Sequence, residues 1–311
     1  MSATLSVVVC THNRHKLLEN CLESLASQKF ERSSLEVIVV DNASTDATKD
    51  VVEGFTRGNL PLQYVYEGRR GVSRARATGF RNSTGRYIAY IDDDVQAPPG
   101  WCAAICQAFE QNAEAYHGKL AALGGPVEPV FEKDRPPWLT ADLEQYYAIL
   151  NLGNALQLFP PGCCPISANA ALRREILKDH PWDETLLMCE DVELFNRLSA
   201  RGFVYLYVPA MCVSHFVPAE RCTVEWLLAR YHSEGLYQKH VRHGFLPKAR
   251  LMGRACLELL RFSACLLFGG EQHRLFHRCN LKFQVGILEG LVKVGGAPKD
   301  YRERFELPKS G

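Results

Sequence analysis

Three adjacent carboxylates are the sharpest chemical signal in this 311-residue chain, because Asp92, Asp93 and Asp94 directly follow the apolar run 87–91. Like charges at this spacing repel one another, and burial raises their pKa values unless a cation compensates them. A hard divalent ion with oxygen ligands, Mg2+ or Mn2+, is the natural compensator, and such ions keep positions open for substrate phosphates. An acidic turn that caps the following helix is the alternative. We therefore predict a divalent metal site at these aspartates.

Glu190 and Asp191 form a second acidic pair, at the start of a predicted helix over 191–200. Acidic residues favour the first turn of a helix through its macrodipole alone. A carboxylate at a helix start can also act as a general base whose charge is held by amide donors. The pair by itself favours the first interpretation, so a catalytic role depends on the motifs that accompany it.

The elements that must position these carboxylates alternate between strand and helix. Apolar, β-branched runs predict strands at 5–10, 35–40, 62–66 and 87–91, with helices between them and Ser44 as the N-cap of the second helix. This alternation is typical of a parallel sheet, whose ligands bind at the carboxyl ends of the strands. We therefore expect the polar residues that follow these strands to meet at one edge. They are Cys10, Thr11, His12, Asn13, Asp41, Asn42 and the three aspartates.

Residues 118–217 are less regular, with strands expected at 120–125 and 203–208 and loops between them that are rich in proline or free of charge. Beyond His215 the pattern becomes helical, over 224–240, 249–268 and 274–294. We expect an α/β fold with a mostly parallel sheet and a helical C-terminal region.

The composition excludes several classes of protein. With 47% hydrophobic and 23% charged residues the chain is ordinary for a globular protein, which excludes disorder, collagen and coiled coil. Twelve cysteines without a Cys-x-x-Cys spacing are typical of reduced thiols and favour the cytoplasm. No run is apolar enough to cross a membrane, and no P-loop, dinucleotide or nucleic-acid motif occurs. We expect no nucleic-acid partner.

Charge is distributed unevenly along the chain. Residues 216–311 hold 16 Lys and Arg against 9 Asp and Glu, although the net charge of the whole chain is only +1. This asymmetry is typical of a region that faces an anionic membrane or a lipid phosphate. A solvated basic helical face gives the same pattern, so both interpretations stay open.

Five segments, in order, resemble the sequence blocks of family 2 glycosyltransferases. Together they span about residues 5–215, and five blocks in register are a strong signal. The segments are Ser6–Arg14, Val39–Asp46, Gly71–Ala77 with Gly85-Arg86-Tyr87 and the aspartates, Ile166–Asn169 with Arg173-Arg174, and Asp183-Glu184 with Glu190-Asp191.

The resemblance implies a GT-A fold and a metal-dependent, inverting glycosyltransferase of the hexosyltransferase type. Its donor would be a nucleotide-diphospho-sugar, with a UDP-sugar favoured, and its acceptor a saccharide or a lipid-linked glycan. The setting implied is synthesis of a surface polysaccharide or lipid-linked glycan, with peripheral contact at the inner face of the membrane. The expected domains are 1–217, with a nucleotide-binding half 1–117 and an acceptor-binding half 118–217, and the helical region 218–311.

The resemblance also implies a donor site residue by residue. Asp41 would accept a hydrogen bond from the base, and Asp94 would hold the metal. His215 would join Asp94 as a metal ligand, and Arg221 would neutralise the leaving diphosphate. The residues implied for the nucleotide are Cys10, Thr11 and His12 at the base and ribose, Arg76 close by, and Asp92 and Asp93 at the ribose and diphosphate.

On the acceptor side, Asp191 would be the general base that takes the proton from the attacking hydroxyl. Asn169, Trp182 and Glu190 would lie beside it. Trp182 could stack on an acceptor sugar, although a single Trp beside a proline is as often part of the core.

The chain departs from the family pattern at three positions, since Ala77 stands for a frequent Asn, His12 for an aromatic ring and Cys10 for a frequent Pro. None of these removes a catalytic carboxylate. Two other functions stay open: a nucleotidyltransferase of sugar phosphates, and an inactive protein that binds sugar nucleotides. The first would want a glycine-rich basic loop near the N-terminus, which residues 5–14 lack, and the second would have lost the carboxylates.

Overall fold

The computed structural model describes residues 3–58, 60–112, 114–241, 253, 256–264 and 270–292. Contacts within the chain divide it into two compact units. The first comprises residues 1–130, 148–186 and 190–216, and the second residues 131–147, 187–189 and 217–311.

The first unit is built on an eight-stranded sheet. The first four strands of the chain run parallel to one another, β9 is antiparallel to both of its neighbours, and β10 is parallel to β6. The mixed α/β architecture with a mostly parallel sheet confirms the expected fold class. The spatial order of the strands is β3 (Leu62–Tyr66), β2 (Leu35–Asp41), β1 (Leu5–Thr11), β4 (Tyr87–Asp92), β9 (Asn169–Arg173), β6 (Leu120–Gly124), β10 (Val204–Tyr207) and β8 (Gln157–Leu158).

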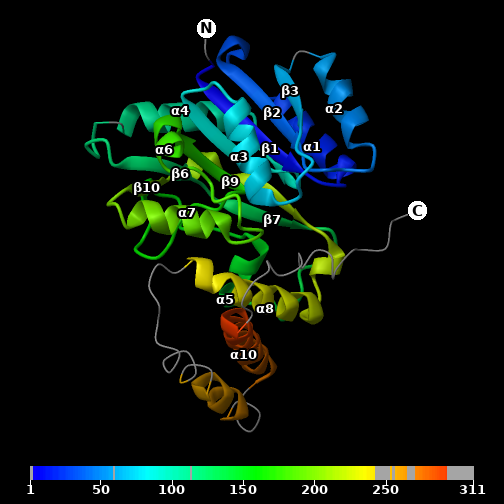
Figure 1. The fold of residues 1–311 in the computed structure, drawn as a ribbon, viewed down its shortest axis with the longest axis vertical. Coiled ribbons are helices and arrows are strands. Elements are labelled where there is room, and N and C mark those ends of the chain that lie inside the picture. The colour runs from blue at the N-terminus through cyan, green and yellow to red at the C-terminus, as the bar shows by residue number, and fades with distance from the viewer. Residues whose placement is uncertain are drawn as a thin grey trace. The chain divides into compact units, whose positions relative to one another are not determined.

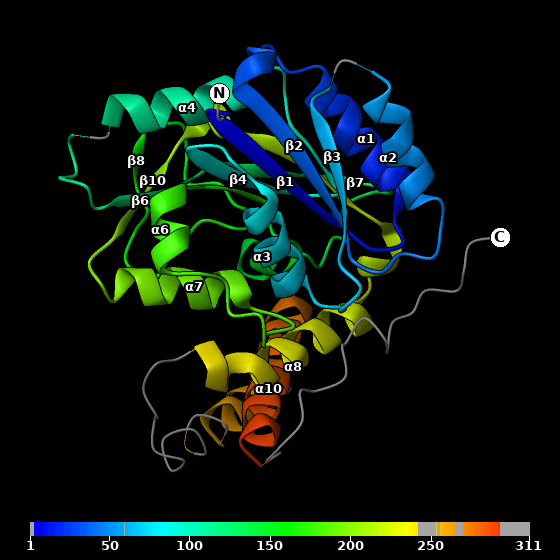
Figure 2. The same ribbon diagram turned by 45° about the horizontal axis from the view of Figure 1, so that its top comes forward.

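Helices cover both faces of this sheet, as Figures 1 and 2 show. Successive side chains of a strand point to opposite faces, so Val7 and Val9 pack into one core cluster and Val8 into the other. The first cluster is covered by α1 (His15–Ala26), α2 (Thr48–Thr56) and α4 (Trp101–Asn112), and the second by α3 (Val72–Asn82), α6 (Arg174–Asp179) and α7 (Glu190–Ser199). Because β1 is buried on both faces, its residues 7–10 form a continuous apolar run rather than an alternating pattern.

A small second sheet brings a distant residue to the end of β4. It has the order β5 (Val95–Gln96), β11 (Val213–Val217) and β7 (Val127–Phe131). The antiparallel register sets His215 opposite Val95, the residue after Asp94. A segment 120 residues further along the chain is thereby fixed next to the three aspartates.

The second unit contains a helix pair, α8 (Val224–Val241) and α10 (Glu271–Val292). A Cβ on Gly235 or Gly286 would lie within 2.2 Å of a carbonyl oxygen of the other helix, so their hydrogens permit the close approach. Helix also occurs at 256–264, inside the predicted segment 249–268, whose other positions mostly lie outside the described residues. Among the described helices, none combines the length and apolar character that a membrane crossing requires. The remaining short helices are η1 (Arg32–Ser34), α5 (Ala141–Glu144), η2 (Gln145–Tyr147), η3 (Pro209–Met211) and η4 (Ala219–Arg221).

Two local predictions were wrong. Ser44 does not cap α2: the helix begins at Thr48, whose amide donates to the carboxylate of Asp46 at 3.1 Å, while the hydroxyl of Ser44 accepts from the amide of Asn13 at 3.0 Å. Residues 169–173 form strand β9 rather than a loop, because the apolar run 170–172 is buried between β4 and β6.

Candidate active site

Strands β1, β2 and β4 end side by side and bring their polar residues together. The register pairs Cys10 with Asp92 and Thr11 with Asp41. The hydroxyl of Thr11 also donates to Asp93 at 2.8 Å. The structure therefore joins the residues that follow these strands at one edge, as the sequence predicts.

The carboxylate cluster, Asp92, Asp93 and Asp94, is compensated by an arginine. Asp93 and Asp94 are buried, and Nη1 of Arg14 donates to Asp93 at 2.8 Å and to Asp94 at 3.0 Å. Burial raises the pKa of Asp93, and the charge of Arg14 opposes that rise. Sequence reasoning gave Arg14 no role, although its position three residues beyond β1 would have placed it at this edge.

Asp94 and His215 are placed to share a ligand. Nε2 of His215 lies 3.4 Å from Oδ1 of Asp94, and both residues are buried. Nδ1 of His215 has no hydrogen-bond partner within the described parts of the chain. Nε2 is the ring nitrogen that faces the carboxylate, and an imidazole nitrogen beside a carboxylate oxygen is a donor set that suits a divalent cation.

The described residues offer no cluster of three or more His, Cys, Asp or Glu side chains arranged around one metal position. Mg2+ in phosphate-transfer sites is commonly held by one or two carboxylates together with substrate phosphates. The Asp94–His215 pair fits a cation of this kind, whose remaining ligands come from the substrate and water.

Asp41 is fixed by two donors on the β2 side of the site. The amide of Ser44 donates to Oδ1 at 2.8 Å, and the hydroxyl of Tyr64 donates to Oδ2 at 2.7 Å. Burial, followed by this hydrogen bond, raises the pKa of Tyr64, so its hydroxyl stays a donor at neutral pH. Nδ1 of His12 lies 2.8 Å from the carbonyl oxygen of Asn42, which orients the imidazole. The predicted contacts of Asp41 and His12 with a base stay predictions.

Cys10 lies between these groups, and its side chain is half-buried. Burial raises the pKa of Cys10 to about 12, so the thiol is neutral at pH 7. A neutral thiol is a poor nucleophile, and the predicted place of Cys10 at the base and ribose stays a prediction.

Arg76 connects the end of β4 to the start of α7. Its guanidinium donates to Glu190 and, at 3.2 Å, to Asp92, and it is only 4% exposed. The same group lies 5.5 Å from the ring centre of Trp182, whose Nε1 donates to the hydroxyl of Tyr90 at 2.8 Å. These contacts leave Trp182 4% exposed, so here it offers an acceptor sugar little surface.

Hydrogen bonds to both oxygens fix the carboxylate of Asp191 at the first turn of α7. Its Oδ2 accepts from the hydroxyl of Ser167 at 2.9 Å and from the amide of Ser167 at 3.3 Å, and its Oδ1 accepts from the amide of Val192 at 2.8 Å. These hydrogen bonds fix the orientation of the carboxylate. A half-buried carboxylate held in this way is able to accept a proton from a hydroxyl that lies within reach.

Two of the predicted site residues have other contacts. Asn169 is 1% exposed and donates from its amide to the carbonyls of Pro126 at 3.0 Å and Met211 at 2.5 Å. Those bonds make it a structural residue that fixes the start of β9. Arg221 lies in η4 of the second unit, where its carbonyl accepts from the hydroxyl of Tyr147 at 3.0 Å. Their acceptor and diphosphate roles stay predictions.

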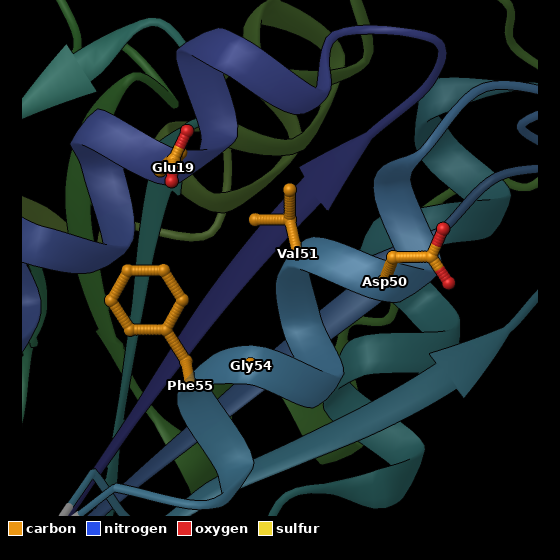
Figure 3. A pocket seen from close by; sticks show the side chains of 5 residues that line it. All are labelled: Glu19, Asp50, Val51, Gly54 and Phe55. Atoms are coloured by element: carbon orange, nitrogen blue, oxygen red, sulfur yellow. The ribbon is translucent and has the colours of Figure 1, made fainter.

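A surface hollow lies away from these residues, between helices α1 and α2 (Figure 3). Glu19 and Asp50 line it together with Val51, Gly54 and Phe55. Two separate carboxylates beside an apolar ring form no constellation for the chemistry above.

Comparison with known proteins agrees with this geometry. The family model for glycosyl transferase family 2 matches residues 6–180. The succinoglycan biosynthesis protein ExoM of Rhizobium meliloti (strain 1021) is 29% identical over 252 residues, which cover 76% of this chain and 74% of that protein. Glycosyltransferase AglE of Haloferax volcanii is 27% identical over 209 residues, which cover 65% of this chain and 64% of that protein.

Solved structures share the fold. The mannosyltransferase PcManGT from Pyrobaculum calidifontis, in complex with GDP-Man and Mn2+, superposes with a TM-score of 0.62 at 21% identity over 94% of this chain and 88% of that one. Residues 1–349 of S. aureus TarS, in complex with UDP-GlcNAc, give a TM-score of 0.53 at 15% identity over 93% of this chain and 91% of that one. These likenesses show the arrangement of the elements, and they leave the ligands of this chain to be argued from its own residues.

Proposed function

The chain belongs to glycosyl transferase family 2, and we propose that it moves a sugar from a nucleotide-diphospho-sugar to an acceptor hydroxyl, with a divalent cation and with inversion at the anomeric carbon. Family membership makes it a glycosyltransferase with a GT-A fold. The metal, the stereochemistry and the roles of single residues are the proposed part.

The observation that carries the proposal is the chain of contacts from the metal pair to the candidate base. His215 lies 3.4 Å from Asp94 at one end, and Arg76 joins Asp92 to Glu190 at the other. Asp191 is the next residue after Glu190. Groups suited to a diphosphate and a group suited to deprotonate a hydroxyl therefore lie in the same compact unit.

Each of these groups has its own role in the proposed sugar transfer. A divalent cation held by Asp94 and His215 would neutralise charge that builds on the leaving diphosphate. Arg76 adds a fixed positive charge next to Asp92, where the nucleotide is proposed to bind. Asp191 takes the proton from the acceptor hydroxyl as it attacks from the opposite face of the sugar. The transition state resembles an oxocarbenium ion, as in glycoside hydrolysis, so no covalent nucleophile is needed.

A thermal-shift screen with UDP, GDP, CMP and dTDP, each with and without Mn2+, tests the donor site, because a ligand that binds only the folded protein raises the melting temperature. We expect one nucleotide to raise it only when Mn2+ is present. Hydrolysis of the matching donor should then be stimulated by Mn2+ and abolished by Asp94→Ala. Metal-independent hydrolysis in both proteins would refute the metal role.

The donor and the acceptor are proposed as chemical classes, not as single compounds. We favour a UDP-sugar, while the neighbours with GDP-Man and UDP-GlcNAc make GDP the first competitor in the screen. The likeness to a succinoglycan biosynthesis protein supports a saccharide or lipid-linked acceptor in polysaccharide synthesis. Inversion is tested by NMR of the product, and a retained anomeric configuration would remove Asp191 from the role of base.

Peripheral contact with an anionic membrane is supported by the helix at 256–264. Leu257, Leu259 and Leu260 are 46%, 51% and 68% exposed, and residues 216–311 carry an excess of basic side chains. Exposed leucines beside basic residues suit an interface of acyl chains and anionic headgroups. We expect the protein to sediment with vesicles that contain phosphatidylglycerol, and Leu257→Glu/Leu260→Glu to weaken this. Equal sedimentation of both proteins would contradict the contact.

A further inference from the structure

Arg14 occupies an unusual position, because a single nitrogen of its guanidinium bridges two buried carboxylates. Nη1 lies 2.8 Å from Asp93 and 3.0 Å from Asp94, whose side chains are each 4% exposed. The side chain of Arg14 itself is 29% exposed and belongs to the loop between β1 and α1. It is therefore a charge that reaches the cluster from the solvent side.

The two oxygens of Asp94 face different partners. Oδ2 accepts from Arg14 at 3.0 Å, whereas Oδ1 lies 3.4 Å from Nε2 of His215. A cation bound between Asp94 and His215 would share the carboxylate of Asp94 with the guanidinium of Arg14. Two positive groups on one carboxylate repel each other. Arg14 and the metal would thus both be stabilised by the negative charge of Asp94.

We propose, resting on the metal site proposed above, that Arg14 is the resident counter-ion of the carboxylate cluster and competes with the divalent cation. Cation affinity is then low in the free protein. A nucleoside diphosphate supplies a second anion for the positive charges, so that cation and Arg14 are held together only when the donor is present. The two ligands therefore bind cooperatively, and each raises the affinity for the other by the same factor.

The chemistry of arginine suits this role. Its guanidinium stays charged at every accessible pH, and its fork of donors matches both carboxylates and phosphates. An arginine fully buried with its carboxylates would be unable to change its partner. The side chain of Arg14 is partly exposed, so its guanidinium is able to rotate from the carboxylates toward a phosphate. The closely paired Arg76 is 5% exposed in its side chain and lacks this freedom.

Direct binding of Mn2+ tests the proposal without any turnover. The loss of the free Mn2+ signal in electron paramagnetic resonance is titrated for the wild-type protein and for Arg14→Gln, with and without the nucleotide found in the screen. We expect Arg14→Gln to bind Mn2+ at least about fivefold more tightly without nucleotide, and the coupling between nucleotide and Mn2+ to fall by a similar factor. The control is Arg230→Gln in the other unit, because Arg230 is 24% exposed and pairs with Glu234 at 2.9 Å. It removes the same charge and should leave Mn2+ affinity unchanged.

Asp94→Asn separates the two proposals. If this variant loses Mn2+ binding while Arg14→Gln binds no more tightly than wild type, the metal site stands and the competition is wrong. If Asp94→Asn binds Mn2+ as well as wild type, the metal site itself is wrong and the competition falls with it. Should Arg14→Gln fail to fold by circular dichroism, Arg14→Lys replaces it, because the hydrated ammonium is a weaker partner for two carboxylates. Wild-type Mn2+ affinity in a folded Arg14→Lys would then overturn the proposal.

Discussion

Arg76 on α3 donates to the carboxylate of Glu190 on α7, and both side chains are almost fully enclosed, at 5% and 7% exposure. Glu190 is adjacent to the candidate base, and Arg76 also holds Asp92. One buried ion pair therefore links the end of β4 to the helix that carries Asp191. Because α3 and α7 are both anchored to the same face of the sheet, a shift of either helix would move donor and acceptor groups relative to one another.

We expect Glu190→Gln to lower both stability and donor affinity. Removal of one partner leaves the other charge buried, which costs about 3–5 kcal/mol, and here Asp92 retains part of the compensation. The free energy of unfolding in urea should fall by about 2–3 kcal/mol, and the donor KM should rise about tenfold.

The matched control for this variant is Glu193→Gln, one turn further along α7. Glu193 is also buried, and it pairs with Arg197 on its own helix at 2.8 Å. A loss of stability without a change in donor KM is the expected result. If both variants change KM equally, the effect of Glu190 is general to the helix and not specific to Arg76.

Asp191→Asn tests the general base. The amide keeps the size of the side chain but has no basic oxygen, so kcat should fall by about 10³-fold while the donor KM changes little. Steady-state rates with a saccharide acceptor provide the measurement.

Glu31→Gln is the control, because Glu31 accepts from the amide of Ser33 at 3.4 Å and its hydroxyl at 3.2 Å, as Asp191 does from Ser167. It should leave kcat unchanged. Wild-type turnover in Asp191→Asn would exclude this carboxylate as the base.

Glu67 gives a prediction of how stability depends on pH. Hydrogen bonds from Arg69, and to a lesser extent from Thr78, lower the pKa of Glu67 to about 2. A carboxylate with a lowered pKa stabilises the folded state above its unfolded pKa, and this contribution disappears as the pH falls through the folded value. Since Arg69 is 61% exposed, solvent screening reduces the contribution to about 1–2 kcal/mol.

The corresponding measurement is urea unfolding of wild type and Glu67→Gln from pH 7 to pH 3. The difference in unfolding free energy should be largest above about pH 4.5 and should narrow steadily below it. Glu53→Gln removes a 49% exposed partner of Lys49 and should show almost no difference. A difference that does not depend on pH would show that lost packing, and not charge, destabilises Glu67→Gln.

Much of the fold follows from sequence patterns, because β1, β2 and β4 are buried along almost their whole length and are mostly apolar, whereas β3 is a partly exposed strand at the edge of the sheet. Strand β9 is not predicted because Asn169–Arg173 is a short run between a segment with three prolines and a charged one. The cap of α2 was misplaced for a different reason. Ser44 follows Ala43, which has φ of 64°, and its hydroxyl is taken by Asn13 before the helix starts.

The sequence predicts the carboxylates of the site, but it predicts only part of the arginine side chains that compensate their charge. The edge shared by Thr11, Asp41 and Asp92 follows from strand register. The pairing of Arg14 with Asp93 and of Arg76 with Glu190 depends on the tertiary positions of a loop and two helices. No spacing in the chain encodes those distances, which is why Arg14 received no role.

Gly79 tests how closely α3 must approach the sheet to place Arg76. A Cβ built on Gly79 would lie 2.3 Å from Cγ1 of Val8 on β1 and 3.3 Å from Cγ2 of Val40 on β2, which is too close for unshifted neighbours. Gly79→Ala therefore forces the helix outward, and overpacking of this kind costs about 1–3 kcal/mol. The donor KM should rise as well, because Arg76 lies on the same helix one turn earlier.

The control is the double variant Gly79→Ala/Val8→Ala, because Val8→Ala removes the atom nearest to the new Cβ. The double variant should lose less stability than the sum of the single variants, and its donor KM should return toward wild type. Additive losses in such a cycle would mean that the two side chains do not meet and that α3 is positioned by other contacts.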